Sequence, residues 1–524
     1  MKATFESYQI LRKEMDAWLV QSRRMDPPSR HGGGEDEANY SLAWFPHYLV
    51  TGSEDLMEHF EYLRDMLAGW VERDCLHGYE PEAEAHHGTE PFLLFLPRYL
   101  GLRPEDEKAK GLLEGAAHHI GNWVEGIPDW FDWDRNRFYG YHIGTRTVGK
   151  DDGFDCEIAE HFRFVHIALA AHRMTGEDRY SEWAIHYGRR RAEMIMAADP
   201  LPIAWGPNGE PMYSDGGPNY RARTPEEYRK AAQAGHHVEG DPLVGLEVLL
   251  ASGVIYALGD LFLASGEQVF QDAAGRIASG VMTELLDPYC DPAAAAVSYY
   301  RQTFQDDSLD EDLQDILGRI PEEQDGELAM VFRENRSRDW PGFGKRNDMT
   351  FWGLWNHDGS VDPFREPCTA TLTLAYQLTG DGSYVERAFK QAASKLIMAR
   401  RVLRGGREHA DMGGAICSIA AGHGRNWGWG PVTGCYGPLL LGTREAKGKV
   451  TPTVEVRQED GRPGVPEQVL PLVVHAGTGM EGAKFYNGGY SDATFSWRFD
   501  ENGWQEVTLA AGKTVEVSFQ GVTA

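Results

Sequence analysis

The chain has 524 residues, of which 42% are hydrophobic and 11% aromatic, and its formal net charge at pH 7 is −29. This apolar content can offset chain entropy in a packed core, which excludes collagen-like and disordered chains. The acidic excess repels nucleic acids and anionic membrane surfaces, so neither is an expected partner. We therefore expect a folded globular protein.

The first residues carry charges at helical spacing and lack an apolar signal-peptide core, so we expect a cytoplasmic protein. The most apolar stretch, residues 243–264, contains Glu247 and Asp260, which leave an uncharged core shorter than the ~18 residues that a membrane span needs. This stretch predicts a buried helix. The six cysteines form no CxxC pair, which favours reduced core thiols over disulfides or structural zinc.

A short phrase recurs four times in the chain. In each copy a Thr or Ser precedes a Gly, a large apolar residue follows four places after the Gly, and an acidic residue comes two places later. Gly suits the left-handed position that ends a helix, and an acid suits the positive end of the next one, so each copy predicts a helical hairpin. The copies are centred on Gly52, Gly176, Gly266 and Gly380.

These glycines are 90 to 124 residues apart, which leaves room for about two hairpins in each interval. Degenerate copies are expected near Gly101 and in residues 305–325, and six or seven hairpins would close a ring. This pattern resembles the six-hairpin toroid superfamily, the (α/α)6 barrels of glycoside hydrolases, polysaccharide lyases and some sugar epimerases. The resemblance implies a mainly α toroid over residues 1–447, with its active site in the cleft.

From about residue 450 the sequence changes to short β-type runs separated by Gly, Pro, Asn and Asp. They predict a small antiparallel, sandwich-like β-domain over residues 448–524, with five strands at 451–458, 468–476, 493–499, 505–511 and 514–520. The segment 477–482 matches GxGxxG, but it follows a β run and leads into no helix, so it predicts no dinucleotide site. Phosphate-loop and HExxH motifs are absent from the sequence, and we expect no cofactor.

Histidines and carboxylates gather in the loops that lead into the predicted inner helices. Because the inner helices of a toroid run in one direction, these loops would meet at one mouth. A single acid there is more often a helix cap than a catalyst, but the doublets at residues 86–87 and 236–237 favour a site. The candidate catalytic residues are Glu90, Asp155, Glu157, Glu239, Asp241, His87 and His237.

Tryptophan and tyrosine also concentrate beside glycine and polar residues in three segments, 122–142, 347–357 and 422–438. Sugar rings stack on aromatic faces, while polar side chains bind hydroxyls, although core packing explains part of this pattern. The candidate substrate-binding residues are His86, Tyr141, His142, Arg146, Trp355, Asn356, His357, Arg425, Asn426, Trp427, Trp429 and Tyr436.

Three functions fit such a cleft. A glycoside hydrolase needs one carboxyl as acid and a second as base or nucleophile, and the preceding loops supply many acids. A lyase for uronate-containing glycans would use His or Tyr as base, with Arg or His to stabilise the developing charge. A glycan-binding scaffold without turnover is the third possibility. The favoured partner is an oligosaccharide or polysaccharide substrate, and the protein could be a monomer or a homodimer.

The segment around Glu366 and Cys368 also resembles the E-x-C segment of the zinc-and-cysteine arabinofuranosidases. The resemblance implies zinc bound by Glu366 and Cys368 and a nucleophile at Cys435. However, Gly434 and Tyr436 flank Cys435, so the second zinc-binding cysteine of that family is missing. We therefore expect core thiols and no metal site.

Overall fold

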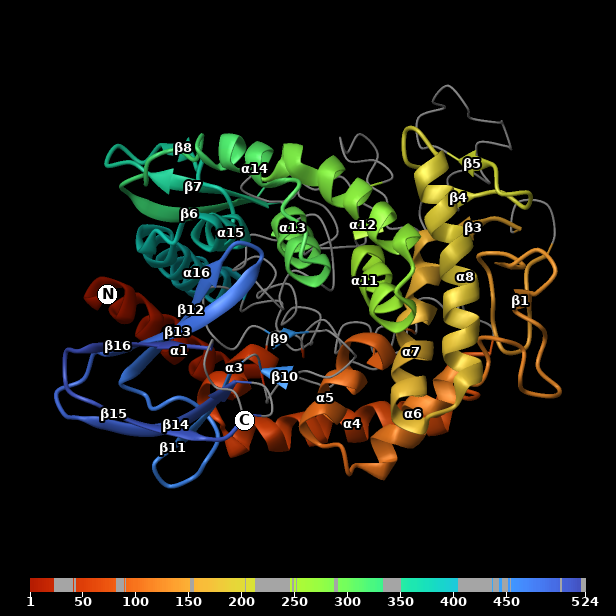
Figure 1. Cartoon of the computed structure of the whole chain (residues 1–524), viewed down its shortest axis with the longest axis horizontal. Coiled ribbons are helices and arrows are strands. Elements are labelled where there is room, and N and C mark those ends of the chain that lie inside the picture. Colours follow the sequence, from red (N-terminus) through yellow and green to blue (C-terminus); the bar gives the residue numbers. More distant parts are fainter. Residues whose placement is uncertain are drawn as a thin grey trace.

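The computed structural model (Figure 1) describes residues 1–22, 41, 44–81, 89, 91–150, 155–202, 204–212, 246, 249–250, 252–286, 291–332, 350–403, 436, 443–444, 451–452, 454–499 and 502–519. These residues form a mainly α-helical part that is followed by small antiparallel sheets. The expected mainly α class is therefore correct. The predicted domain boundary, residues 447–450, lies outside the described residues.

After an N-terminal helix, α1 (Lys2–Ser22), the described helices follow one another in pairs. In each pair the two helices are joined by a short junction. The pairs are α3 (Trp44–Thr51) with α4 (Glu54–Asp74), α5 (Leu96–Leu102) with α6 (Glu107–Ala117), α7 (Arg163–Thr175) with α8 (Asp178–Ala197), α11 (Val254–Ser265) with α12 (Gln268–Val281), α13 (Asp291–Phe304) with α14 (Asp310–Leu317), and α15 (Thr369–Thr379) with α16 (Gly382–Leu403).

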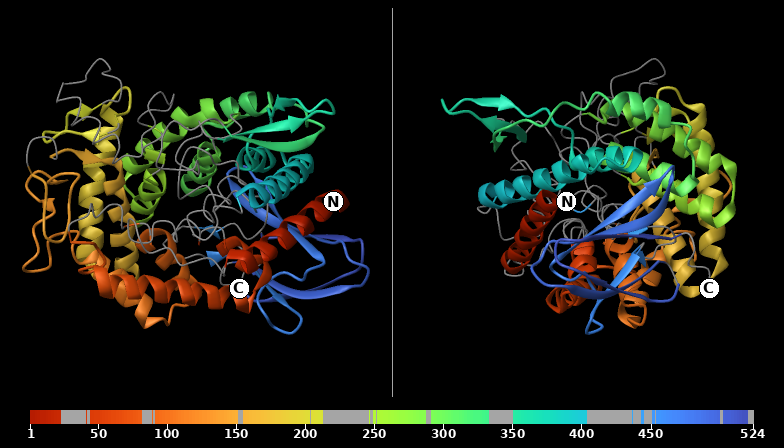
Figure 2. Two further views of the ribbon diagram at one scale, coloured as in Figure 1. Left: turned by 180° about the vertical axis from the view of Figure 1, so that it is seen from behind. Right: turned by 60° about the vertical axis from the view of Figure 1, so that its left-hand side comes forward.

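The first helices α7, α11 and α15 are buried on all sides over about two turns, whereas α8 is buried along one face. Every residue of α7 from 163 to 171 and every residue of α15 from 369 to 376 is buried. On α8 the buried residues recur at helical spacing and leave the opposite face in water. Neighbouring pairs pack against one another, and α16 packs against α1, so the helices form a series, the helical circuit, whose first and last members are in contact (Figures 1 and 2).

The four predicted junction glycines lie between paired helices. Gly52, Gly176, Gly266 and Gly380 all have positive φ, from 61° to 75°. The degenerate copies also coincide with junctions, since α5 and α6 join just after Gly101 and α13 and α14 join at residues 305–309. The prediction of one helix over 243–264 needs correction, because Gly253 has a φ of 67° and α11 begins only at Val254.

Several short sheets interrupt the helical part, and the sequence did not predict them. One pairs β1 (Phe131–Asp132) with β2 (Arg137–Phe138), and another joins β3 (Glu157–Ile158), β4 (Ala204–Trp205) and β5 (Pro211–Met212). A third contains β6 (Glu327–Phe332), β7 (Thr350–Trp355) and β8 (Val361–Pro363), and it projects beyond the helices in the right view of Figure 2. All three arise from the connections that lead into α7, α11 and α15.

The C-terminal strands form two three-stranded antiparallel sheets, ordered β11-β14-β15 and β12-β13-β16. Their bounds are β11 (Val454–Gln458), β12 (Val469–Ala476), β13 (Gly479–Asn487), β14 (Ala493–Phe499), β15 (Gln505–Leu509) and β16 (Thr514–Ser518), and a small ribbon of β9 (Thr443–Arg444) and β10 (Thr451–Pro452) precedes them. Phe485 of one sheet packs against Phe495 and Trp497 of the other, at 4.9 and 6.5 Å between ring centroids. The five predicted strands are present, whereas β13 was missed.

This β region packs onto the helices. The Val465 amide donates to the Val50 carbonyl at 2.8 Å, and the Tyr376 hydroxyl donates to the Val473 carbonyl at 2.5 Å. Gly464 comes so close to the first junction that a Cβ there would lie 2.7 Å from the Thr51 carbonyl oxygen. The loop before β12 therefore fits onto the α3–α4 junction through glycine.

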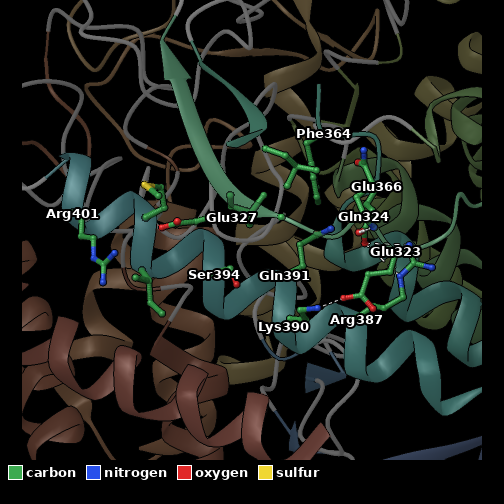
Figure 3. A pocket seen from close by; sticks show the side chains of 15 residues that line it. Glu323, Gln324, Glu327, Phe364, Glu366, Arg387, Lys390, Gln391, Ser394 and Arg401 are labelled. Carbon is green, nitrogen blue, oxygen red and sulfur yellow. Dashed lines mark hydrogen bonds and ion pairs between the residues drawn. The ribbon is translucent and has the colours of Figure 1, made fainter. Parts of the chain in front are cut away.

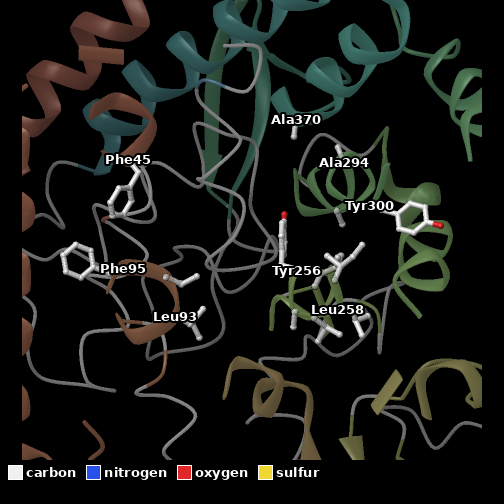
Figure 4. Packing of buried hydrophobic residues seen from close by; sticks show 14 of the residues in the cluster. Phe45, Leu93, Phe95, Tyr256, Leu258, Ala294, Tyr300 and Ala370 are labelled. Atoms are coloured by element: carbon white, nitrogen blue, oxygen red, sulfur yellow. The ribbon is translucent and has the colours of Figure 1, made fainter. Parts of the chain in front are cut away.

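One continuous buried cluster joins these elements. Figure 4 shows part of it, with Phe45 of α3, Tyr256 and Leu258 of α11 and Ala294 of α13 all placed inside the circuit. Within the described part of the chain, no helix is both long enough and apolar enough to cross a membrane.

Candidate active site at the start of helix α7

The segment that leads into α7 brings several predicted site residues together. It consists of β3 and a 3-10 turn, η3 (Ala159–Phe162), and it runs directly into the buried helix. Asp155 and Glu157 belong to this segment. Tyr141, His142 and Arg146 lie on the turns just before it.

Glu157 forms a buried ion pair. Its Oε2 lies 2.6 Å from Arg191 of α8, and its Oε1 accepts a hydrogen bond from the Phe138 amide at 2.9 Å. Only 2% of the Glu157 side chain is exposed. Both carboxylate oxygens of Glu157 are therefore occupied by partners within the protein.

Arg137 connects this ion pair to Asp155. Its guanidinium donates to the backbone carbonyl of Asp155 and, at 3.2 Å, to that of Tyr139. Burial lowers the pKa of Arg137, although nearby Glu157 opposes the shift. The half-buried Asp155 is thereby fixed through its backbone carbonyl.

Glu160 and His161 of η3 are fully buried just before α7. The His161 ring lies 4.5 Å from that of Phe138 between centroids. Burial, together with the positive charges of Arg191 and Arg137, lowers the pKa of His161 to about 3. The imidazole is therefore neutral at physiological pH and is a weak base.

The neighbouring turns hold the remaining residues of this group. Tyr141 is buried, and a hydrogen bond joins its backbone to His161. The His142 carbonyl accepts from the Gly149 amide at 2.8 Å, and the Arg146 amide donates to the Pro81 carbonyl at 3.0 Å. The Arg146 backbone therefore lies beside Pro81.

A second polar cluster involves Tyr436, which the sequence also singled out. The Tyr436 hydroxyl lies 2.9 Å from Nδ1 of His47 on α3, and His47 Nε2 lies 2.8 Å from Oδ1 of Asp16 on α1. A carboxylate at Asp16 can only accept, so His47 donates through Nε2 and accepts the tyrosine proton at Nδ1. Burial lowers the pKa of His47, and Asp16 opposes this shift.

The other described candidates lie across the circuit from α7. Trp355 ends β7 and is 49% exposed, while Asn356 and His357 form the turn before β8. The Asn356 amide and side chain both bond Ser360, at 2.9 and 3.0 Å, as expected for turn residues. The structure does not bring these three residues to the start of α7.

Glu366 and Cys368 precede and cap α15. Glu366 accepts from the Gln324 amide at 2.9 Å and from Arg387 at 3.1 Å, whereas the Cys368 thiol contacts the Thr371 hydroxyl at 3.3 Å. Among the described residues, no group of three or more His, Cys, Asp or Glu side chains is arranged to hold a metal ion.

Ten further candidates lie outside the described residues. They are His86, His87, Glu90, His237, Glu239, Asp241, Arg425, Asn426, Trp427 and Trp429, and Cys435 lies there too. Their roles remain predictions.

The sequence missed three groups that the structure places in or beside these sites. Glu160 was overlooked because it stands among the apolar residues that predicted the face of α7, although a charge inside such a face was a usable signal. Arg191 and Asp16 belong to neighbouring helices, so nothing in their local sequence connects them with Glu157 or His47.

Comparison of the chain with protein-family models, with curated proteins and with solved structures found no match.

Proposed function

We propose that this protein is a glycoside hydrolase built on a toroid of six helical hairpins, with its active site at the start of α7. The observation that carries this proposal is the fully buried carboxyl of Glu160, three residues before α7, whose residues 163–171 are all buried, and close in sequence to Asp155. A carboxyl withdrawn from water is typical of the general acid in glycosidases.

The toroid interpretation is supported by an asymmetry of loop length. The junctions at residues 52–53, 176–177, 266–267 and 380–381 are short, whereas the connections into α7, α11 and α15 are long and contain the small sheets. Long polar connections that converge on one side of a rigid helical frame are the usual location of binding and catalytic residues.

In this proposal Glu160 protonates the leaving glycosidic oxygen as the bond to the anomeric carbon breaks. Asp155 is the second carboxylate, which either activates water or attacks the anomeric carbon directly. Glu157 and Arg191 hold β3, and therefore Asp155, in place. Glu90, Glu239 and Asp241 remain candidates for the second carboxylate.

The Asp16–His47–Tyr436 series favours a second candidate, a lyase for uronate-containing glycans. A tyrosine whose proton is accepted by a histidine can act as the base that removes the proton next to a carboxylate. Burial lowers the pKa of Arg12, but nearby Tyr8 and Tyr436 outweigh this effect and raise it. The Arg12 guanidinium is therefore near Tyr436, and a guanidinium is a suitable partner for the enolate-like charge.

One incubation separates these proposals. Purified protein is mixed with neutral and with uronate oligosaccharides, and both new reducing ends and the ultraviolet absorbance of a 4,5-unsaturated uronate are followed. Hydrolysis produces reducing ends without absorbance, whereas elimination produces both signals together. We expect reducing ends alone, and a paired rise of both signals would replace the hydrolase proposal by the lyase.

Two variants then test the residues. Glu160→Gln and Asp155→Asn should each lower kcat by at least about 100-fold with an unchanged melting temperature, because the amide cannot exchange the proton. Glu182→Gln, an exposed acid on α8, is the matched control and should retain full activity. Full activity in both site variants would reject the assignment.

A further inference from the structure

The described residues form a pocket of about 580 Å³ between α16 and the β6–β8 sheet (Figure 3). This volume falls within the ~300–1,000 Å³ of typical small-molecule sites. The pocket lies across the circuit from the start of α7 (Figure 1), so it is distinct from the proposed active site. Of the predicted site residues, it contains only Glu366.

One end of the pocket is fixed by interactions that are already complete. Glu366 pairs with Arg387 at 3.1 Å, and Glu323 pairs with Lys390. The buried Gln391 donates to the Pro367 carbonyl at 3.0 Å, and its side-chain oxygen accepts from Thr369 and Lys395, both at 3.2 Å. These groups form a rigid wall whose charges are cancelled in pairs.

The other end offers polar groups with open capacity. Arg401, Glu327 and Ser394 line the pocket, and their side chains make no hydrogen bond or ion pair with the residues that the structure describes. They supply, respectively, donors only, acceptors only, and a hydroxyl that can do both. Apolar side chains cover much of the remaining lining, namely Leu328, Leu354, Phe364, Ile397 and Met398.

We propose that this pocket binds a neutral saccharide, as a substrate-binding site separate from the catalytic centre. A sugar presents hydroxyls that both donate and accept, together with apolar C–H faces, and the open groups and the apolar lining match these two features. Among the described residues, an anion would meet the unpaired carboxylate of Glu327, and a cation would meet the unpaired guanidinium of Arg401. The inference rests on the proposed function in that the substrate is a carbohydrate, and it specifies the neutral class over uronates.

Hydrogen exchange on the intact protein tests the site directly. The probes are a neutral glucan trisaccharide, trigalacturonate as the anion and glycine as the zwitterion. We expect the neutral trisaccharide to slow exchange in the peptides that cover residues 323–332 and 386–403, and the other two probes to leave them unchanged. Equal or stronger protection by trigalacturonate or glycine, or no protection in these peptides, would overturn the proposal.

Ser394→Trp fills the pocket and should remove this protection. Ser383→Trp makes the same change at an exposed position outside the pocket on α16 and should retain it. In case Ser394→Trp does not fold, Glu327→Gln with Arg401→Met should weaken trisaccharide binding roughly tenfold or more. The exposed Glu322→Gln, outside the pocket lining, is its control. Unchanged protection in the pocket variants would overturn the proposal.

Reducing-end release is measured on the same samples, which separates the two proposals. Hydrolysis without protection at the pocket would reject the pocket and leave the hydrolase. Protection at the pocket without hydrolysis of any probe would reject the hydrolase and leave the pocket as a saccharide site.

Discussion

At the scale of single residues, the four junctions share a device that explains why Thr or Ser precedes each glycine. The hydroxyls of Thr51, Thr175, Ser265 and Thr379 each donate to the carbonyl four residues earlier, at 2.7 to 2.8 Å. Each hydroxyl also accepts from the amide two residues later, at 3.2 to 3.3 Å. One small side chain therefore binds a carbonyl in the last turn of one helix and an amide that precedes the next helix.

The junction hydroxyl should contribute measurably to stability. Thr175→Val keeps the shape of the side chain but leaves both partners without this bond, so we expect a loss of about 1–2 kcal/mol in chemical unfolding. Thr175→Ser should recover most of the loss, because Ser265 makes the same two contacts in another copy. A valine variant as stable as the native chain would show that water replaces the hydroxyl.

A buried histidine should make the protein sensitive to acid. Burial lowers the pKa of His119 from 6.5 to about 3, and this side chain is 3% exposed beside Trp130. Between these two pH values the unfolded chain binds more protons than the folded one, so stability is present above pH 6.5 and falls as the pH falls toward 3. His119→Phe should therefore make stability decline less steeply between pH 6.5 and 4.

Thermal unfolding at a series of pH values measures this slope, which is at most ~1.4 kcal/mol per pH unit for one group. His357→Phe, at an exposed position in the turn before β8, is the control and should leave the slope unchanged. A His119→Phe slope equal to that of the native chain would contradict the prediction.

At the scale of elements, helices were predictable and the small sheets were not. The junction phrase and the apolar spacing of α7 and α15 are local signals, so they indicate helices without knowledge of the fold. In contrast, β3 has two residues and pairs with β4, which lies beyond the whole of α7 and α8. Such a strand is fixed by its partners rather than by its own sequence.

The ion pair between Arg191 of α8 and Glu157 of β3 should stabilise the folded structure at the start of α7. Arg191→Met leaves the Glu157 carboxylate buried without its partner, which we expect to cost about 3–5 kcal/mol. Adding Glu157→Gln removes the unpaired charge, so the double variant should be more stable than Arg191→Met alone. Thermal unfolding of the two single variants and the double variant gives the coupling energy. A coupling near zero would remove the structural role assigned to Glu157.

At the scale of the whole molecule, the sequence predicted which connections carry polar residues but not how they meet. Asp155 is joined to the turn at Tyr139 because Arg137 donates to both of their carbonyls, and Arg191 holds β3 through Glu157. Tyr436 instead meets His47, and Trp355 lies on a projecting sheet. These outcomes depend on contacts between distant segments, and composition and spacing within one segment contain no information about them.

The β region and the helical circuit should unfold together because they meet through backbone at a glycine. A Cβ at Gly464 would lie 2.6 to 2.8 Å from backbone atoms of Thr51 and Gly52, so Gly464→Ala must separate the loop from the α3–α4 junction. Gly461 lies in the same loop with a similarly positive φ, 84° against 101°, but its Cβ would meet nothing within 4 Å. Both alanine variants have a strained backbone at a positive φ, but only Gly464→Ala also clashes with Thr51 and Gly52. In calorimetry we expect one transition for the native chain and for Gly461→Ala, and two transitions for Gly464→Ala, with the β region melting first. A single transition in Gly464→Ala, shifted no further than in Gly461→Ala, would show that the remaining contacts between the two parts, such as the Tyr376 and Val465 hydrogen bonds, are sufficient to hold them together.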